Sequence, residues 1–176
     1  MTICCYGDSN TYGYDPRSFL GERYDAPWPE ALAELTGFSV RNNGFCGRRV
    51  PVRDVILPRN TDLILVMLGT NDLLSGEEPR RIAEKMEEFL RLYDKSRLIL
   101  IAPPPLCRGE WVCSDDLILR SKSLAEEYLT AAARLGIRFL DAGAWSIPLC
   151  YDGVHFTEEA HRAFAEQIAS FLQERP

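Results

Sequence analysis

The sequence predicts an α/β protein whose strands form one parallel sheet. Short, continuously apolar segments alternate along the chain with longer segments in which apolar residues recur at helical spacing. Residues 62–68, DLILVML, are apolar after their first residue, which is typical of a parallel strand covered by helices on both faces. These observations together indicate five strands with helices between them.

The individual elements follow from local sequence patterns. Five short apolar segments, each compatible with a strand, lie at residues 2–6, 38–41, 62–68, 97–102 and 137–140. Helical spacing of apolar residues predicts helices at residues 27–36, 79–93, 114–135 and 157–173. Gly37 and Gly136 stand just after two of these helices, where glycine commonly ends a helix. Glu158 and Glu159 lie in the first turn of the last helix, where the helix dipole favours negative charge.

Length and composition indicate one globular domain over residues 1–176. The chain is long enough to bury a core, and 46% hydrophobic with 26% charged residues is ordinary for a soluble protein. The net charge of −6 disfavours nucleic-acid binding, for which a basic face is expected. The first motif begins at residue 7, which leaves no room for a signal peptide, and no apolar run is long enough to span a bilayer. We therefore expect a cytoplasmic protein with neither a nucleic acid nor a membrane as partner.

The six cysteines predict neither a disulfide framework nor a metal site. A chain of this size without a secretion signal does not need cross-links, and no two cysteines form a CxxC pair. We expect most of them to be small buried hydrophobic residues. Cys107 and Cys113 lie in one loop, which leaves open a local bridge between them.

Polar motifs after the first and last strands predict a nucleophile and its base. Gly7-Asp8-Ser9 follows the first strand, and a serine becomes nucleophilic only beside a base that a third group orients. His155 lies three residues after Asp152 in a turn before the last helix, so Asp152 can orient the imidazole that takes the proton of Ser9. The other histidine, His161, lies among charged residues, and we expect it to be solvated.

Two further motifs could supply hydrogen-bond donors where negative charge develops during acyl transfer. Gly44 follows the second strand, and without a Cβ its N–H can approach a substrate. Asn71 follows the third strand and can donate from its amide, and the N–H of Ser9 is the third candidate. Each motif taken alone is also an ordinary turn. Asp8 and Asp72 are interpreted as structural carboxylates that accept from backbone N–H groups.

Together, the motifs GDS, NGxxGR, GxND and DxxH occur once each and in this order. The set resembles the SGNH hydrolase (GDSL-type esterase/lipase) superfamily over residues 6 to 160, and Ser9, Gly44, Asn71 and His155 match the residues that name it. The forms GDSxTxGY and NGxxGR resemble its arylesterase and acetyl-hydrolase branch. Asn10 departs from the pattern, since a leucine often follows the serine.

The resemblance implies a three-layer α/β/α, flavodoxin-like fold with a five-stranded parallel sheet. It implies a catalytic triad of Ser9, His155 and Asp152, and an oxyanion hole formed by Ser9, Gly44 and Asn71. No metal or cofactor is required. Relatives in this branch often form oligomers that shape the pocket, so by analogy we expect a homo-oligomer.

The substrate is expected to be a small ester. Loops at the same sheet edge should wall the acyl pocket, and Tyr12, Tyr14, Phe45, the loop 103–111 and Val154 are candidates for these walls. Of these, Tyr12, Phe45, Trp111 and Val154 are the predicted substrate-binding residues. No long apolar lid segment is present, which favours short acyl chains. We therefore expect a serine carboxylester hydrolase acting on short-chain, for example acetyl, esters. Two alternatives stay open: a thioesterase or lysophospholipase with the same site, and a flavodoxin-like module whose residue 7–14 loop binds phosphate or flavin without catalysis.

Overall fold

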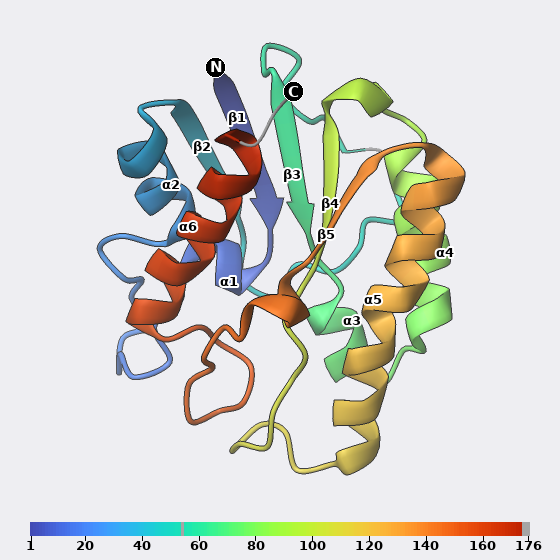
Figure 1. Ribbon diagram of the computed structural model, residues 1–176. Helices are drawn as coiled ribbons and strands as arrows, with labels where there is room; N and C mark the ends of the chain where they lie inside the picture. The colour runs from blue at the N-terminus through green and yellow to red at the C-terminus, as the bar shows by residue number, and fades with distance from the viewer. Residues whose placement is uncertain (54, 174–176) are drawn as a thin grey trace.

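A five-stranded parallel sheet lies at the centre of the computed structural model, which describes residues 1–53 and 55–173 (Figure 1). The strands stand in the order β2-β1-β3-β4-β5. Their bounds are β1 Thr2–Gly7, β2 Ser39–Gly44, β3 Leu63–Met67, β4 Leu98–Ala102 and β5 Arg138–Asp141. Helices cover both faces, so the predicted α/β/α class is confirmed.

Four longer helices form the outer layers. Helices α2 (Trp28–Thr36) and α6 (Glu158–Gln173) pack together on one face of the sheet, and α4 (Pro79–Leu90) and α5 (Asp115–Leu135) pack together on the other (Figure 1). Two short helices, α1 (Ser9–Tyr12) and α3 (Thr70–Leu74), follow β1 and β3 directly. The patterns did not predict these short helices, because four or five residues are too few to show helical periodicity.

Alternate strand residues supply two separate hydrophobic cores. On β1, Cys4 and Tyr6 face the core under α4 and α5, whereas Ile3 and Cys5 face the core under α2 and α6. Side chains of a strand alternate between the faces of its sheet, so a strand covered on both sides must be apolar throughout. This requirement explains the uninterrupted apolar run of β3, whose five residues are all buried.

The second strand is longer than predicted, and this changes the position of one motif. The predicted strand ended at residue 41, but β2 pairs with β1 as far as Gly44, which lies opposite Gly7. Asn42 and Gly44 therefore lie inside the strand and not in the loop after it. Pairing with β1 outweighs the turn preference of asparagine and glycine here.

The cysteines are less buried than predicted. All six are free, and only Cys4 and Cys5 are buried, while Cys46, Cys107 and Cys113 are exposed. The three exposed residues belong to loops beyond the strands, where no second layer covers them. Within residues 1–53 and 55–173, no helix has both the length and the apolar character needed to cross a bilayer.

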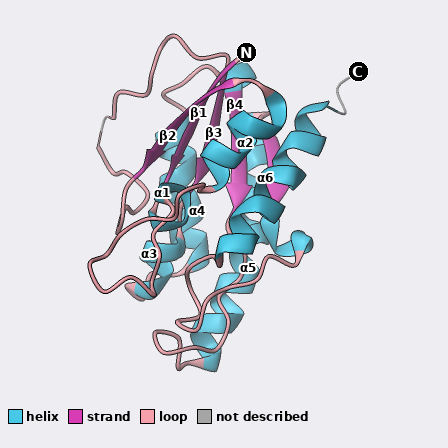
Figure 2. Ribbon diagram, turned by 90° about the vertical axis from the view of Figure 1, so that its left-hand side faces the viewer, coloured by secondary structure: helices cyan, strands magenta, loops and turns pink. Residues whose placement is uncertain are grey.

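The loops at the carboxyl ends of the strands gather at one end of the sheet (Figure 2). They include α1, α3, the long connection from β4 to α5, and the turn between β5 and α6. Each of the polar motifs lies at this end, as expected for a parallel sheet.

Candidate active site

Three side chains from distant parts of the chain form one hydrogen-bonded series at this end of the sheet. Ser9 begins α1 immediately after β1, and its Oγ lies 3.0 Å from Nε2 of His155. Nδ1 of the same ring lies 2.6 Å from Oδ2 of Asp152. All three residues are buried. The structure thus brings together the residues that the motifs singled out as nucleophile, base and orienting acid.

A tight turn holds Asp152 and His155 in this relation. The other carboxylate oxygen of Asp152 accepts from the backbone N–H groups of Val154 (2.9 Å) and His155 (3.0 Å). Gly153 has a φ of +80°, a conformation that glycine adopts without steric strain. Because one carboxylate both closes the turn and contacts the ring, the imidazole can present only its Nε2 to Ser9.

The charge state of Asp152 suits this arrangement. Burial by itself would raise the pKa of Asp152, but hydrogen bonds from the His155 ring and from the N–H groups of His155 and Val154 outweigh it, so the pKa lies below its usual value. Asp152 is therefore ionised at neutral pH, and its Oδ2 accepts a hydrogen bond from the N–H at Nδ1 of His155. A carboxylate in this position also stabilises the imidazolium that forms when His155 takes a proton.

The serine and the imidazole open into a small pocket. Its volume is about 230 Å³, and it is lined by Ser9, Tyr14, Cys46, Gly47, Asn71, Trp111 and His155. Two aromatic rings flank His155: the ring centroid of Tyr14 lies 4.8 Å away, and that of Trp111 lies 5.3 Å away in an edge-on arrangement. The walls are therefore mainly apolar around a polar floor.

The structure contradicts the predicted role of Gly44. Its N–H donates to Oδ1 of Asn42 at 2.9 Å, and a Cβ added at Gly44 would lie 2.1 Å from the backbone nitrogen of Tyr12. Gly44 thus packs β2 against α1 and does not line the pocket. The prediction for Gly44 was wrong because it ended the strand at residue 41. β2 pairs with β1 as far as Gly44, so the loop after the strand begins three residues later in the motif.

Gly47, the second glycine of the same motif, lies at the pocket instead. It has a φ of +75°, and within the described part of the chain its N–H has no hydrogen-bond acceptor. The amide of Asn71 lies in the same pocket, and Nδ2 donates one hydrogen to the carbonyl of Arg48 at 3.1 Å. An asparagine amide carries two hydrogens, so the second stays available to a ligand. As the first residue of α1, Ser9 has an N–H without an acceptor inside the helix.

Of the four residues predicted to bind substrate, Trp111 lines the pocket and the other three do not. Tyr12 lies against the guanidinium of Arg23, 5.2 Å from the ring centroid, and Phe45 is exposed. Val154 is buried in a small apolar cluster with Leu106 and Val112. Tyr14, also named as a candidate wall residue, lines the pocket, and Gly13 between the two tyrosines has a left-handed backbone conformation.

His161 is buried, which contradicts the expectation that it is solvated. Its Nδ1 accepts from the N–H of Trp28, at the start of α2, at 3.2 Å. Burial lowers the pKa of His161 to about 3, so the ring is neutral. The spacing of His161, Phe164, Ala165 and Ile168 along α6 was the signal that could have shown this, since it is the buried stripe of the helix.

Asp8 and Asp72 accept hydrogen bonds from backbone N–H groups, as expected of structural carboxylates. Asp8 caps α1 through the N–H of Asn10, and burial raises the pKa of Asp8 to about 6. Asp72 accepts from the N–H of Val50 at 3.0 Å, and it pairs with Lys85. These contacts position α1 and the loop that carries Gly47.

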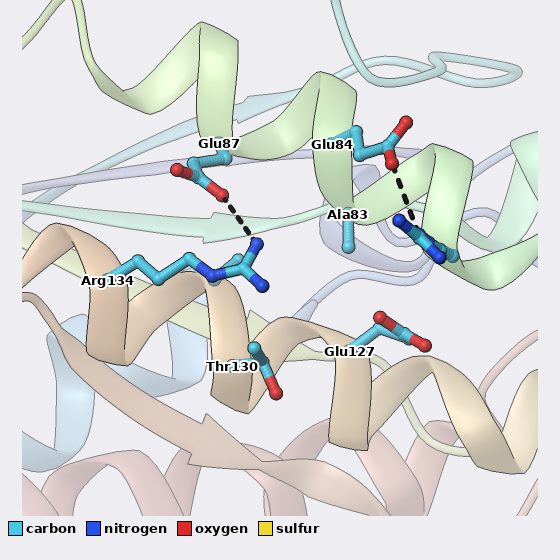
Figure 3. Close-up of a pocket in the computed structure, with 8 residues that line it drawn as sticks. Ala83, Glu84, Glu87, Glu127, Thr130 and Arg134 are labelled. Carbon is cyan, nitrogen blue, oxygen red and sulfur yellow. Dashed lines mark hydrogen bonds and ion pairs between the residues drawn. The ribbon is translucent and has the colours of Figure 1, made fainter.

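A second cavity of about 310 Å³ lies between α4 and α5, far from Ser9 in the fold (Figure 3). Its charged residues are largely paired with one another: Glu84 with Arg80, and Glu87 with Arg134. No serine, cysteine or histidine lines it. Its one hydroxyl, that of Thr130, donates to the carbonyl of Glu126 at 3.1 Å and has no histidine beside it in the cavity lining. The pocket at Ser9 is therefore the candidate site.

Comparisons with known proteins agree with the fold and show the family of the chain. Residues 5–163 match the model of the GDSL-like lipase/acylhydrolase family. The match covers most of the chain, so the protein belongs to this family.

Solved structures show the same architecture. An aryl esterase of M. smegmatis superimposes with a TM-score of 0.84 at 26% identity, and the match covers 98% of both chains. A carbohydrate acetylesterase of Sinorhizobium meliloti superimposes with a TM-score of 0.81, at 23% identity and with 98% of both chains covered, which supports the fold alone.

Two curated relatives are longer proteins than this chain. A GDSL esterase/lipase of Arabidopsis thaliana is 27% identical over 85% of this chain and 59% of its own length. An isoamyl acetate-hydrolyzing esterase 1 homolog of Rattus norvegicus is 33% identical over 48% of this chain and 43% of its own length. The chain therefore spans about half the length of the curated relatives it matches.

Proposed function

We propose that this protein hydrolyses small carboxylic esters with Ser9 as the nucleophile. The observation that carries the proposal is the unbroken series from Ser9 Oγ through His155 to Asp152, with contacts of 3.0 and 2.6 Å at the floor of a pocket. A serine hydroxyl in this position can lose its proton to the ring as it attacks a carbonyl carbon. Family membership supports the same reaction class.

The reaction proceeds through an acyl-enzyme. Ser9 Oγ bonds to the ester carbonyl carbon while its proton moves to Nε2 of His155, and the carbonyl oxygen becomes an oxyanion. The N–H groups of Ser9 and Gly47 and the Asn71 amide donate to that oxyanion. The C–O bond to the alcohol then breaks as His155 returns the proton to the leaving oxygen. Water repeats the sequence on the acyl-serine and releases the carboxylic acid.

The pocket favours short acyl chains. At about 230 Å³ it is smaller than the pockets that enclose drug-sized ligands, which measure about 300–1,000 Å³. The rings of Tyr14 and Trp111 beside His155 provide flat surfaces for an aromatic or other apolar leaving group. The relatives named as aryl esterase and as isoamyl acetate-hydrolyzing esterase homolog support acetyl esters as the first substrates to test.

A phosphate- or flavin-binding role for the residue 7–14 loop is less favourable. The start of α1, where an anion would meet backbone N–H groups, already holds the side chain of Asp8. A bound phosphate would lie beside this buried carboxylate and would be repelled when it is ionised. Ester hydrolysis requires no such anion site.

The test combines a substrate panel with a mapped covalent label. We expect p-nitrophenyl acetate to be hydrolysed faster than the laurate ester, acetyl-CoA or lysophospholipid, and a fluorophosphonate to label Ser9. Ser9→Ala should lower kcat by about 10⁴- to 10⁶-fold without unfolding the protein. Activity of Ser9→Ala within tenfold of the wild type, or a label on another residue, would reject the proposal. Faster turnover of the thioester or lysophospholipid would instead favour those alternative activities.

A further inference from the structure

Asn10, the residue next to the proposed nucleophile, contacts the turn that carries His155. Its side chain is buried, with 4% of the residue exposed. Nδ2 donates to the backbone carbonyl of Val154 at 3.0 Å, and Oδ1 accepts from the backbone N–H of Phe156 at 2.9 Å. One side chain of α1 thus holds the backbone groups on both sides of His155.

We propose that Asn10 is a positioning residue that keeps His155 in register with Ser9. The inference rests on the proposed esterase function and deepens it. A primary amide presents one donor group and one acceptor in a plane, which matches a carbonyl and an N–H two residues apart on a neighbouring segment. Leucine, which has a similar size, would satisfy neither group.

The loop after β4 and the hydroxyl of Tyr24 also bond to this segment, but Asn10 is the residue of α1, besides Ser9 itself, whose side chain reaches it. Contacts within the turn set its shape and not its distance from Ser9. Asp152 accepts from two N–H groups within the turn, and the N–H of Cys150 donates to the carbonyl of His155. These bonds join residues of the same short segment. The bonds of Asn10 reach 144 and 146 residues along the chain to Val154 and Phe156.

The nucleophile end of this link is also fixed. The N–H of Asn10 donates to Oδ1 of Asp8 at 3.0 Å, so the residues on either side of Ser9 are held together. The Asn10 bridge thus joins the segment that carries Ser9 directly to the segment that carries His155, whose side chains are 3.0 Å apart. A displacement of about 1 Å between reacting groups can lower a rate by roughly 100-fold.

A positioning role differs from a purely structural one in what it changes. Asn10 does not line the pocket, so its loss should leave substrate binding almost unchanged. Proton transfer between Ser9 and His155 should slow, which lowers kcat and the rate of phosphonate labelling together. A residue that only stabilises the fold would lower the unfolding temperature and leave kcat of the folded fraction intact.

The experiment compares Asn10→Leu and Asn10→Ala with the wild type. Leucine has a similar size to asparagine but forms no hydrogen bonds, whereas alanine leaves room for water. If Asn10→Leu does not fold, the kinetic comparison is made with Asn10→Ala. We expect kcat for p-nitrophenyl acetate to fall about 10- to 100-fold with KM within about threefold. The downfield proton resonance of the His155–Asp152 hydrogen bond should shift or broaden in both variants, which is a readout independent of turnover.

Thr61→Val is the matched control. Thr61 is buried near the amino end of β3, and its hydroxyl donates to the carbonyl of Pro58 and accepts from Arg97. The valine variant also loses one donated and one accepted hydrogen bond, but far from Ser9, and its kcat should equal that of the wild type.

The outcomes separate this inference from the proposed function. If the wild type hydrolyses esters and the Asn10 variants show the same kcat and the same histidine resonance, the inference is overturned. The esterase proposal then still stands. An equal loss of kcat in Thr61→Val would overturn it as well. A wild-type protein that neither hydrolyses esters nor reacts with the phosphonate would overturn both.

Discussion

At the scale of single residues, the site depends on where each hydrogen-bond donor is directed. Asn71 illustrates this, because the carbonyl of Arg48 holds one of its amide hydrogens and so determines the orientation of the other. Arg48 is itself held by the carbonyl of Gly7 at 3.0 Å and by the ring of Tyr6, whose centroid lies 4.2 Å from the guanidinium carbon. The donors of the proposed oxyanion hole are therefore placed before a substrate arrives.

Asn71→Ala should lower kcat by about 100- to 1,000-fold with little change in KM, because the lost donor acts on charge that develops only in the transition state. Steady-state kinetics with p-nitrophenyl acetate would measure this split. Asn60→Ala, an exposed position at the opposite end of the sheet, serves as the control and should not alter kcat. A tenfold rise in KM at unchanged kcat in Asn71→Ala would assign this amide to ground-state binding instead.

At the scale of elements, the contact between α6 and α2 depends on a neutral histidine. His161 lies between these helices, where the rings of Tyr24 and Phe156 are 5.2 and 5.3 Å from its own. Its Nδ1 accepts an N–H that the first turn of α2 cannot satisfy within the helix. Protonation would remove this acceptor and place a charge in an apolar layer.

The stability of the protein should therefore fall in acid in a way that His161 controls. The pKa of His161 is lowered from 6.5 to about 3 by burial. Below about pH 6.5 the imidazole is protonated in the unfolded chain but stays neutral in the folded chain. The contribution of the neutral His161 to the free energy of unfolding is therefore complete above that pH and is lost progressively as the pH falls. The slope contributed by one such group is at most about 1.4 kcal/mol per pH unit.

His161→Gln should remove this slope, because glutamine does not titrate and its carbonyl can still accept from Trp28. Urea unfolding of both proteins at several values from about pH 4 to pH 7 would measure it as a difference in free energy of unfolding. Asp8, with its pKa raised to about 6, acts in the opposite direction in both proteins and cancels in the comparison. Parallel curves for the two proteins would show that His161 does not titrate as described.

At the scale of the whole molecule, two loops from different strands join to build the site. The connection after β4 runs beside the turn after β5, and the N–H groups of Cys107, Glu110 and Trp111 donate to the carbonyls of Gly153, Tyr151 and Asp152, respectively. This ladder places Trp111 over the pocket and supports the turn that holds His155. Gly109 lies at the closest approach, where an added Cβ would be 2.4 Å from the carbonyl carbon of Asp152.

Gly109→Ala should force these loops apart. We expect kcat to fall at least about tenfold and the free energy of unfolding to fall by about 1–3 kcal/mol, because the new methyl group would overlap backbone atoms that cannot rotate away. Gly37→Ala is the control: its Cβ meets nothing within 4 Å, although its φ of +68° is unfavourable for alanine. The control should lose stability alone, and equal kcat in the two variants would refute the coupling of the loops to the site.

Much of the fold and of the site could be predicted from the sequence, but the strands and the catalytic cluster could be predicted better than the short helices. The apolar runs identified β1, β3 and β4, because a central strand covered on both faces is apolar at nearly every position. The edge strands β2 and β5 were predicted from shorter segments, and the predicted β2 ended three residues too early. The Ser9, Asp152 and His155 cluster could be predicted because parallel strands end at the same edge of a sheet, so motifs after strands meet there. The short helices α1 and α3 could not, since they are too short to show a period.

What the sequence determined by itself was the layered α/β fold and the strand ends at which reactive side chains gather, because both follow from repeating local patterns of apolar and polar residues. Only the tertiary structure decided which members of a motif face the pocket: Gly47 and not Gly44, Tyr14 and not Tyr12. It also decided that His161 is buried. These choices depend on how far β2 pairs with β1 and on which helix covers α6, and such contacts between distant segments leave no periodic trace in the local sequence.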